Sequence, residues 1–131
     1  MLEVVKKGNK EYATNIPYST SERRIGTWID GKPLYRKVIL VDNPTIGTGV
    51  QTTATTISGV NNITKIEGLM KSSGGFNIPF NSIWSNDINA RNSLLWVDVT
   101  SNTANIKYTI NSNWISITNL VIIVEYTKTT D

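Results

Sequence analysis

The side chains that carry out most enzyme chemistry are scarce in this sequence. It contains no histidine and no cysteine, which excludes Ser-His-Asp and Cys-His triads, imidazole acid–base catalysis, disulfides and zinc sites built from these ligands. Carboxylate pairs remain, because two acids about 5 to 10 Å apart in a cleft can cleave a glycosidic bond. The acids in or next to expected turns and strands are Asp30, Asp42, Asp87 and Asp98. Because turn, loop and solvent-facing positions explain these acids better than a catalytic pair does, we expect no enzymatic activity.

Phosphate and metal sites are not indicated either. The string TIGTGV (residues 45–50) lacks the third glycine and the later acidic residue of a dinucleotide-binding loop, so it predicts a glycine-containing strand or turn. Calcium needs several carboxylates at short spacing, and SND (residues 85–87) supplies one. We therefore expect neither a metal nor a cofactor.

The segment SSGGFNIPFNSIWSNDINARNS (residues 72–93) combines loop-forming residues with large aromatic side chains. An exposed ring flanked by Asn, Asp or Arg is typical of a saccharide site, where the ring stacks on the sugar and the polar groups bind its hydroxyls. In the alternative, Phe76, Phe80 and Trp84 hold the loop to the core or fill a subunit interface, the role also expected of Trp28, Trp96 and Trp114. The expected ligand-binding residues are Phe76, Asn77, Trp84, Asn86, Asp87 and Arg91.

The elements that would position these residues are strands. The sequence predicts strands at residues 34–41, 94–100, 105–110 and 119–128, with weaker signals at 46–60 and 63–71. In the third of these, Ile106, Tyr108 and Ile110 share one face. The last strand is apolar on both faces, so we expect it to be central. Six to nine short strands without a helical stripe predict an all-β fold, an antiparallel β-sandwich resembling a jelly roll.

The stretch GTWIDGKPLYRK (residues 26–37) predicts a hairpin with two possible registers. A two-residue turn at Asp30 and Gly31 sets Trp28 against Pro33. A four-residue loop, residues 30–33, is favoured because it leaves the proline at the loop's end and makes apolar and aromatic cross-strand pairs. Those pairs are Ile29 with Leu34 and Trp28 with Tyr35.

Length and charge predict one domain, residues 1–131, with residues 1–16 as a leading segment. The net charge is +3, but the basic residues are scattered singly or in pairs, so we expect no nucleic-acid partner. The start MLEVVKKGNK is not a signal peptide. No apolar run is long enough to cross a bilayer, so we expect no membrane insertion.

One stretch of the chain resembles bacteriophage proteins. The string YSTSERRIGTWIDGKPLYRKVI (residues 18–39) resembles a motif of tail-fibre, tail-appendage and related virion proteins, written Y-S-T-x-E-x-x-x-G-x-W-I-D-G-K-P-L-Y-R-K. IVEYTKTTD (residues 123–131) is similar to the ending of the same proteins, and IPFN (residues 78–81) to a short element they share. The matching motif residues are Tyr18, Ser19, Thr20, Glu22, Gly26, Trp28 and residues 29–37.

The resemblance covers about residues 17–131 and is weak in the middle. It implies a C-terminal domain of a phage fibre or appendage, made in the host cytoplasm and carried on the virion as a homotrimer beside other virion proteins. The implied ligand is a bacterial surface glycan or cell-wall polymer. The alternative is a structural trimerisation or assembly domain of a head-fibre, collar or tail-tip protein that binds no ligand. About sixteen residues precede the motif, so the chain is either an excised domain or a small virion protein.

Overall fold

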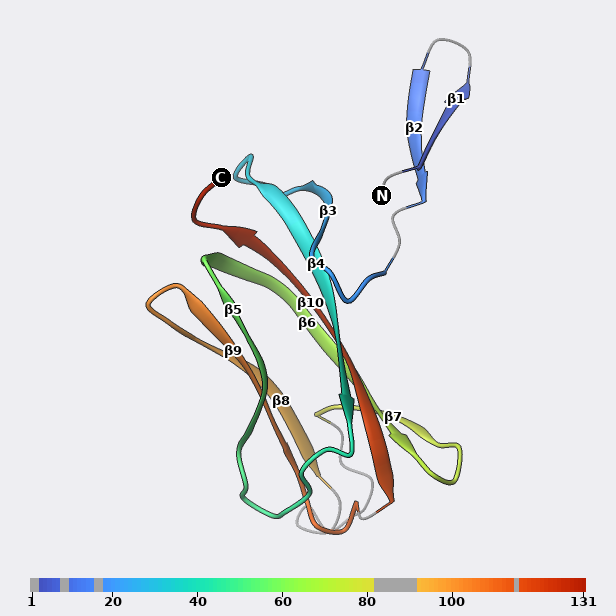
Figure 1. Ribbon diagram of the computed structural model, residues 1–131, viewed down its shortest axis with the longest axis vertical. Coiled ribbons are helices and arrows are strands. Elements are labelled where there is room, and N and C mark those ends of the chain that lie inside the picture. The colour runs from blue at the N-terminus through green and yellow to red at the C-terminus, as the bar shows by residue number, and fades with distance from the viewer. Residues whose placement is uncertain (1–2, 8–9, 16–17, 82–91, 115) are drawn as a thin grey trace.

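The computed structural model describes residues 3–7, 10–15, 18–81, 92–114 and 116–131, and only the backbone of the first two segments (Figure 1). These residues form ten strands and no helix. β1 (Glu3–Lys7) and β2 (Lys10–Asn15) make a separate antiparallel hairpin, which was not predicted. The remaining strands are β3 (Arg23–Thr27), β4 (Pro33–Asp42), β5 (Thr52–Ser58), β6 (Val60–Ser72), β7 (Asn77–Pro79), β8 (Ser93–Thr100), β9 (Thr103–Ile110) and β10 (Ile117–Lys128).

Two antiparallel sheets pack face to face and form the body of the molecule (Figure 1). The larger sheet has the order β3-β4-β10-β6-β7 and the smaller one the order β5-β9-β8. The chain passes between the sheets after β4, β5, β7 and β9, so neither sheet is a simple run of hairpins. The prediction of an all-β antiparallel sandwich is confirmed. The strands divide five and three between the sheets.

The last strand is central, as its sequence predicts. β10 lies between β4 and β6 and pairs with both over most of its length. Its alternate residues Leu120, Ile122, Val124 and Tyr126 are fully buried and face the smaller sheet. From that sheet β9 contributes a matching buried row, which confirms the predicted face: Ala104, Ile106, Tyr108 and Ile110. These two rows are the centre of the hydrophobic core.

A close approach between the sheets is possible because β6 carries a glycine at residue 68. Gly68 lies beside Ile122 of β10 and faces inward. A Cβ built there would lie 3.0 Å from a ring carbon of Phe80 and 3.0 Å from a methyl carbon of Leu95 on β8. No side chain fits at that distance without movement of its neighbours. The glycine therefore allows the side chains of β8 and of the segment after β7 to pack directly on β6.

The hairpin between β3 and β4 differs from both predicted registers. The Trp28 N–H donates to the Lys32 carbonyl at 2.8 Å, and the Gly31 N–H donates to the Trp28 carbonyl at 2.9 Å. The loop therefore has three residues, Ile29 to Gly31, and Trp28 is opposite Lys32 instead of Tyr35 or Pro33. Tyr35 pairs with Arg24.

The reason for this register is the conformation of one glycine. Gly31 has a φ of 88°, which completes a type I turn followed by a left-handed residue, the usual three-residue hairpin connection. The Asp30 carboxylate accepts the Lys32 N–H at 3.0 Å and stabilises the turn. Ile29 is left at the tip with 92% of its surface exposed, so the predicted apolar pair with Leu34 does not form.

Two weaker sequence predictions are only partly correct. The strand expected at residues 46–60 is shorter, because a turn with Gly49 at a φ of 77° precedes β5. The loop expected at residues 72–93 contains the short strand β7, which pairs with residues 69–71 of β6. Phe80, just after β7, is buried with its ring edge against Tyr108 at a centroid distance of 6.5 Å. For Phe80 the alternative prediction of core packing is thus confirmed.

Candidate functional site

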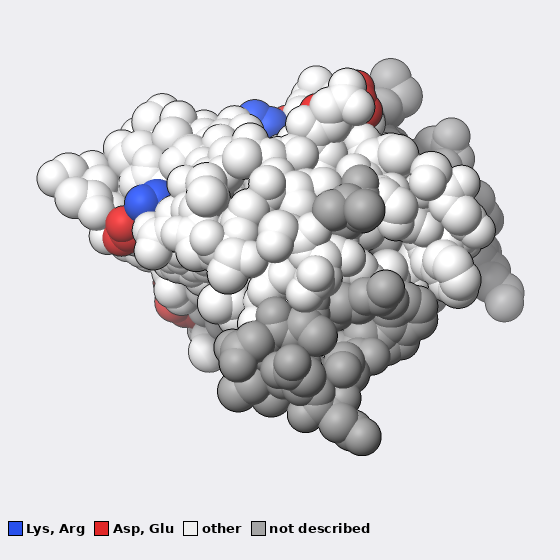
Figure 2. Space-filling model, turned by 90° about the horizontal axis from the view of Figure 1, so that it is seen from below, with Lys and Arg blue, Asp and Glu red and all other residues white. Residues whose placement is uncertain are grey.

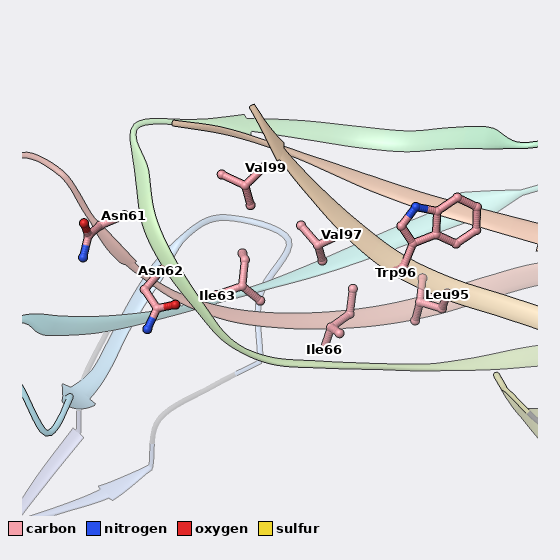
Figure 3. A pocket seen from close by; sticks show the side chains of 8 residues that line it. All are labelled: Asn61, Asn62, Ile63, Ile66, Leu95, Trp96, Val97 and Val99. Carbon is pink, nitrogen blue, oxygen red and sulfur yellow. The ribbon is translucent and has the colours of Figure 1, made fainter. Parts of the chain in front are cut away.

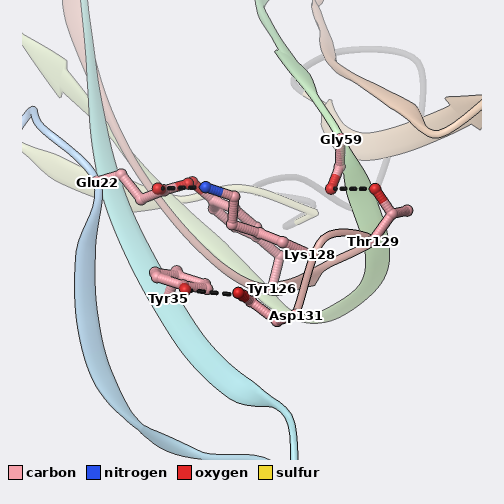
Figure 4. Close-up of polar contacts among 7 residues, drawn as sticks. All are labelled: Glu22, Tyr35, Gly59, Tyr126, Lys128, Thr129 and Asp131. Carbon is pink, nitrogen blue, oxygen red and sulfur yellow. Dashed lines mark hydrogen bonds and ion pairs between the residues drawn. The ribbon is translucent and has the colours of Figure 1, made fainter.

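The phage-like motif and the last strand meet in one cluster of polar and aromatic side chains (Figure 4). One carboxylate oxygen of Glu22 accepts a hydrogen bond from the buried Tyr126 hydroxyl at 2.5 Å, and the other lies 2.9 Å from the Lys128 ammonium. The Tyr35 hydroxyl donates to the Asp131 carboxylate at 2.7 Å. The rings of Tyr35 and Tyr126 stack with their centroids 6.2 Å apart. We call these five residues the motif cluster.

Contacts within the motif cluster raise the pKa values of Tyr35, Tyr126 and Lys128. Burial, followed by the hydrogen bond to Glu22, raises the pKa of Tyr126 well above its ordinary value. The hydrogen bond to Asp131 raises the pKa of Tyr35, and the bond to Glu22 raises the pKa of Lys128. These shifts keep the tyrosines neutral and the lysine charged. The contacts of the cluster join the motif to the last strand.

Other motif residues have structural contacts of the same kind. The Lys32 ammonium donates to the backbone carbonyls of Lys128 and Asp131, at 3.4 and 3.1 Å. The Arg36 guanidinium lies 3.7 Å from the ring centre of Tyr18, a cation–π contact. The motif (residues 18–39) and the ending (residues 123–131), which carry the resemblance, thus lie together in space.

A groove opens where the edges of the two sheets face each other. β8 is the edge strand of the smaller sheet. β7 pairs only with residues 69–71 of β6, so among the described residues the first part of β6 has no neighbour on that side. Between these edges lies a groove with a volume of about 540 Å³ (Figure 3), within the usual range for small-ligand sites. The residues lining this β6–β8 groove are Asn61, Asn62, Ile63, Ile66, Leu95, Trp96, Val97 and Val99.

The β6–β8 groove has an apolar wall with amides at one end, and the indole of Trp96 lies on the opposite side of β8 from Leu95 and Val97 (Figure 3). Trp96 lies at one end of the row of side chains from β8. Asn61 and Asn62 lie beyond Ile63 at the start of β6. The Asn61 amide nitrogen donates to the Thr127 hydroxyl at 3.3 Å, which holds that side chain in place. An apolar surface with amides at one end is suited to a molecule with both apolar and hydroxyl-bearing sides.

Of the six residues predicted to bind a ligand, two lie in described parts of the chain. Phe76 is 56% exposed in the turn after β6, and Asn77 is the exposed first residue of β7. Both lie beyond the end of β6 that is opposite Asn61 and Asn62, so the structure does not bring them to the β6–β8 groove. The other four, which lie outside the described residues, are Trp84, Asn86, Asp87 and Arg91.

The described candidate acids have separate places. Asp30 is the turn residue of the β3–β4 hairpin, and Asp42 is exposed at the far end of β4. Asp98 lies on β8 with a carboxylate oxygen 3.8 Å from the Lys107 ammonium. Asp87 lies outside the described residues. The three described aspartates do not line the β6–β8 groove. Within the described part of the chain, no group of three or more acidic, His or Cys side chains is placed to hold a metal ion.

The tryptophans show what the sequence reasoning missed. Trp114 is buried and donates its indole N–H to the Asn92 carbonyl at 3.0 Å, as expected for core packing. Trp96 instead lies at the rim of the groove, on the outward side of β8, and the alternation of LLWVDVT contains the signal for this position. Leu95 is buried and Val97 is packed against the core, so Trp96 between them must point away from the core. The contribution of Asn61 and Asn62 had no such signal, because asparagine is common throughout the chain.

Charge is sparse on the end of the molecule opposite the β3–β4 hairpin. In the described part of that face, Lys, Arg, Asp and Glu are isolated spots on a mostly uncharged surface (Figure 2). A nucleic-acid site needs a continuous basic stripe, and this face does not have one in its described part.

Comparison with protein-family models found no match, and searches of curated proteins and of solved structures found none either. The resemblance to virion proteins therefore depends on the motif and ending quoted above. The described residues include no helix of the length and hydropathy required to span a membrane.

Proposed function

We propose that this chain is a non-catalytic domain of a bacteriophage fibre or appendage, and that it attaches the virion to a saccharide on the bacterial surface. The observation that carries the proposal is the β6–β8 groove, in which the amides of Asn61 and Asn62 lie at one end of an apolar wall and Trp96 lies at the rim. The resemblance of the motif to virion proteins supplies the setting. No carboxylate lines the groove among its eight residues, which supports binding over glycoside cleavage.

The chemistry of the groove fits a sugar ring. A pyranose presents C–H groups on one face, which pack on an indole, and hydroxyls at its rim, which pair with amides. A volume of about 540 Å³ accommodates a short oligosaccharide and not a polymer in full. Each such contact is weak, so several copies of the domain on one particle would raise the total affinity through avidity.

The motif cluster and the β6–β8 groove have separate roles, the first in joining segments of the fold and the second in binding. Its side chains are engaged with one another, between β4, β10 and the segment before β3. The groove is built instead from the chain between the motif and the ending, where the resemblance is weak. A structural motif combined with a groove outside the strong part of the resemblance suits a domain whose partner differs from one host to another.

A pull-down on purified cell walls tests the proposal. The full chain is incubated with peptidoglycan carrying wall polysaccharide from Gram-positive and gut bacteria, and retention is compared between variants. We expect Trp96→Ala and Asn62→Ala to reduce retention about tenfold, the loss of one stacking or hydrogen-bonding contact. Trp28→Ala, which removes an indole outside the groove, is the matched control and retains binding.

Two outcomes would count against the groove. Binding that persists in a folded Trp96→Ala variant but disappears in Trp84→Ala would place the site in the loop first expected to contact ligand. If the wild-type protein binds no wall preparation, the assembly role remains as the function of the domain.

The assembly role is the second candidate, because the larger sheet has exposed apolar side chains on its outer face. Leu40 is 59% and Leu69 41% exposed. A stable oligomer that ignores every cell wall would favour a structural domain of a head fibre, collar or tail tip, with other virion proteins as its partners.

A further inference from the structure

The outer face of the five-stranded sheet carries an apolar row across its three central strands. Leu40 of β4 and Leu69 of β6 are both opposite Val121 of β10. Directly paired residues of an antiparallel sheet point to the same face. The next residues along these strands, Ile39, Ile122 and Gly68, face the core, so the row points away from it. Val38 and Ile123 extend the apolar surface one step along the strands. We call these five residues the outer apolar face.

Charged residues on β6 are symmetric about the middle of this row. The outward side chains of β6 are Lys65, Glu67, Leu69 and Lys71 in order, as their pairing with the outward residues of β10 shows. Glu67 and Lys71 thus lie two residues before and two residues after Leu69. Alternate residues of a strand are about 6.6 Å apart, so the acid and the base are at equal distances on opposite sides of the leucine.

We propose that the outer apolar face is a two-fold interface with a second copy of this chain. The two-fold axis lies between the sheets, across the strands, and passes over Leu40, Val121 and Leu69. Each residue of the row then meets its own copy, and the two sheets stack face to face about 10 Å apart. Glu67 of each copy faces Lys71 of the other, so two equivalent ion pairs flank the leucines.

The charges select this axis over the other face-to-face arrangement. An axis parallel to the strands would place Glu125 against its own copy. It would also bring Arg36 against Lys65, because these residues lie on either side of Glu125 in the same row. Like charges facing each other are destabilising. The axis across the strands avoids both contacts. It also sets Val38 of each copy opposite Asp42 of the other, because Asp42 lies in the same row as Lys71.

The expected interface is small. Three strands about 4.8 Å apart and about eight residues each give roughly 400 Å² per copy, about half the usual 800 Å² of a stable specific interface. We therefore expect a dimer that forms at micromolar or higher concentration. On a virion, where neighbouring copies are held close together, such an interface is populated because the effective concentration is high.

Sedimentation velocity of the full chain between about 5 and 500 μM, without saccharide, tests the proposal. We expect a monomer–dimer equilibrium. Leu40→Lys puts two charges on the symmetry axis and should weaken it roughly a hundredfold. Glu67→Lys and Lys71→Glu should each weaken it about tenfold, because each removes both ion pairs and brings like charges together. The double variant Glu67→Lys/Lys71→Glu restores the pairs and should return to within about threefold of wild type.

The double variant separates this interface from a general loss of structure, since only reciprocal pairing lets the second substitution repair the first. Thr53→Lys, on the exposed side of the smaller sheet, is the matched control and should leave the equilibrium unchanged. A monomer at every concentration would overturn the proposal. So would a trimer, which the phage resemblance implies, or any oligomer that the double variant does not rescue. Saccharide binding is measured separately, so failure of this interface leaves the groove untouched.

Discussion

Replacing Glu22 with alanine tests how strongly the motif is joined to the last strand. Its carboxylate is the acceptor for the Tyr126 hydroxyl and the partner of Lys128. Tyr126 is completely buried, so its hydroxyl would lose its partner inside the protein, at a cost of about 1 to 3 kcal/mol. The ion pair is partly exposed, with about 30% of each side chain accessible, and contributes about 0.2 to 1 kcal/mol. We expect Glu22→Ala to lower the free energy of unfolding by about 2 to 3 kcal/mol.

Urea unfolding followed by tryptophan fluorescence measures this loss. Domains of this size are stable by about 5 to 15 kcal/mol, and the slope in urea is about 1 to 3 kcal/mol/M. The unfolding midpoint should fall by about 1 M or more while the slope stays constant. Protein below 1 μM keeps self-association out of the measurement.

Glu67→Ala is the matched control, because Glu67 is also paired with a lysine, Lys65, at 3.6 Å but is half exposed. We expect a change below about 0.5 kcal/mol for it. A double-mutant cycle of Glu22→Ala with Tyr126→Phe should give a coupling of about 1 to 2 kcal/mol. If Glu22→Ala costs no more than Glu67→Ala, or if the coupling is zero, the motif cluster does not stabilise the fold as argued.

Two further perturbations follow from single residues. Gly68→Ala adds a Cβ 3.0 Å from Phe80 and Leu95 and should lower the free energy of unfolding by about 1 to 3 kcal/mol. Gly26→Ala, the control, has open space around it and should lower it by under about 1 kcal/mol. Equal unfolding midpoints of the two variants in urea would contradict the packing argument. Because the pKa of Tyr126 is raised in the folded state, its contribution is complete below the unfolded pKa of about 10 and is lost as pH rises above it. The free energy of unfolding should therefore fall between pH 9 and 11.5, and less steeply in Tyr126→Phe, whereas identical slopes would show that this tyrosine is not responsible.

The arrangement of strands could be predicted because it depends on short-range alternation. The period-two pattern of residues 105–110 and the two-sided apolar pattern of residues 119–128 each have one stable solution, a half-buried strand and a central one. Both are confirmed in β9 and β10. Residues 46–60 were less predictable because their threonines favour a strand and their glycines favour turns.

The register of the β3–β4 hairpin could not be read from residue types alone. The favoured four-residue loop would pair Trp28 with Tyr35 and Ile29 with Leu34 across the strands. The observed one is determined by the left-handed conformation of Gly31 and by the Asp30 carboxylate. The gain from turn geometry exceeded the gain from burying Ile29, which remains exposed at the tip.

The motif cluster and the β6–β8 groove are long-range features, and the sequence holds no local signal for either. Glu22 and Tyr126 are 104 positions apart, and the groove joins Asn62 to Trp96 across two sheets. Only the fold brings such residues together. Only the alternation of side chains along residues 94–100 gives a local indication, because it places Trp96 on the side of the strand that faces away from the core.

The central claim is that the β6–β8 groove binds a saccharide, and nuclear magnetic resonance tests it most directly. Soluble wall oligosaccharides are titrated into the ¹⁵N-labelled chain while the indole N–H signals and the side-chain amides are followed. The account predicts that the Trp96 indole and the Asn61 and Asn62 amides shift together with one saturation curve, while the Trp114 indole in the core stays in place. Saturable shifts that leave Trp96, Asn61 and Asn62 unmoved would contradict it.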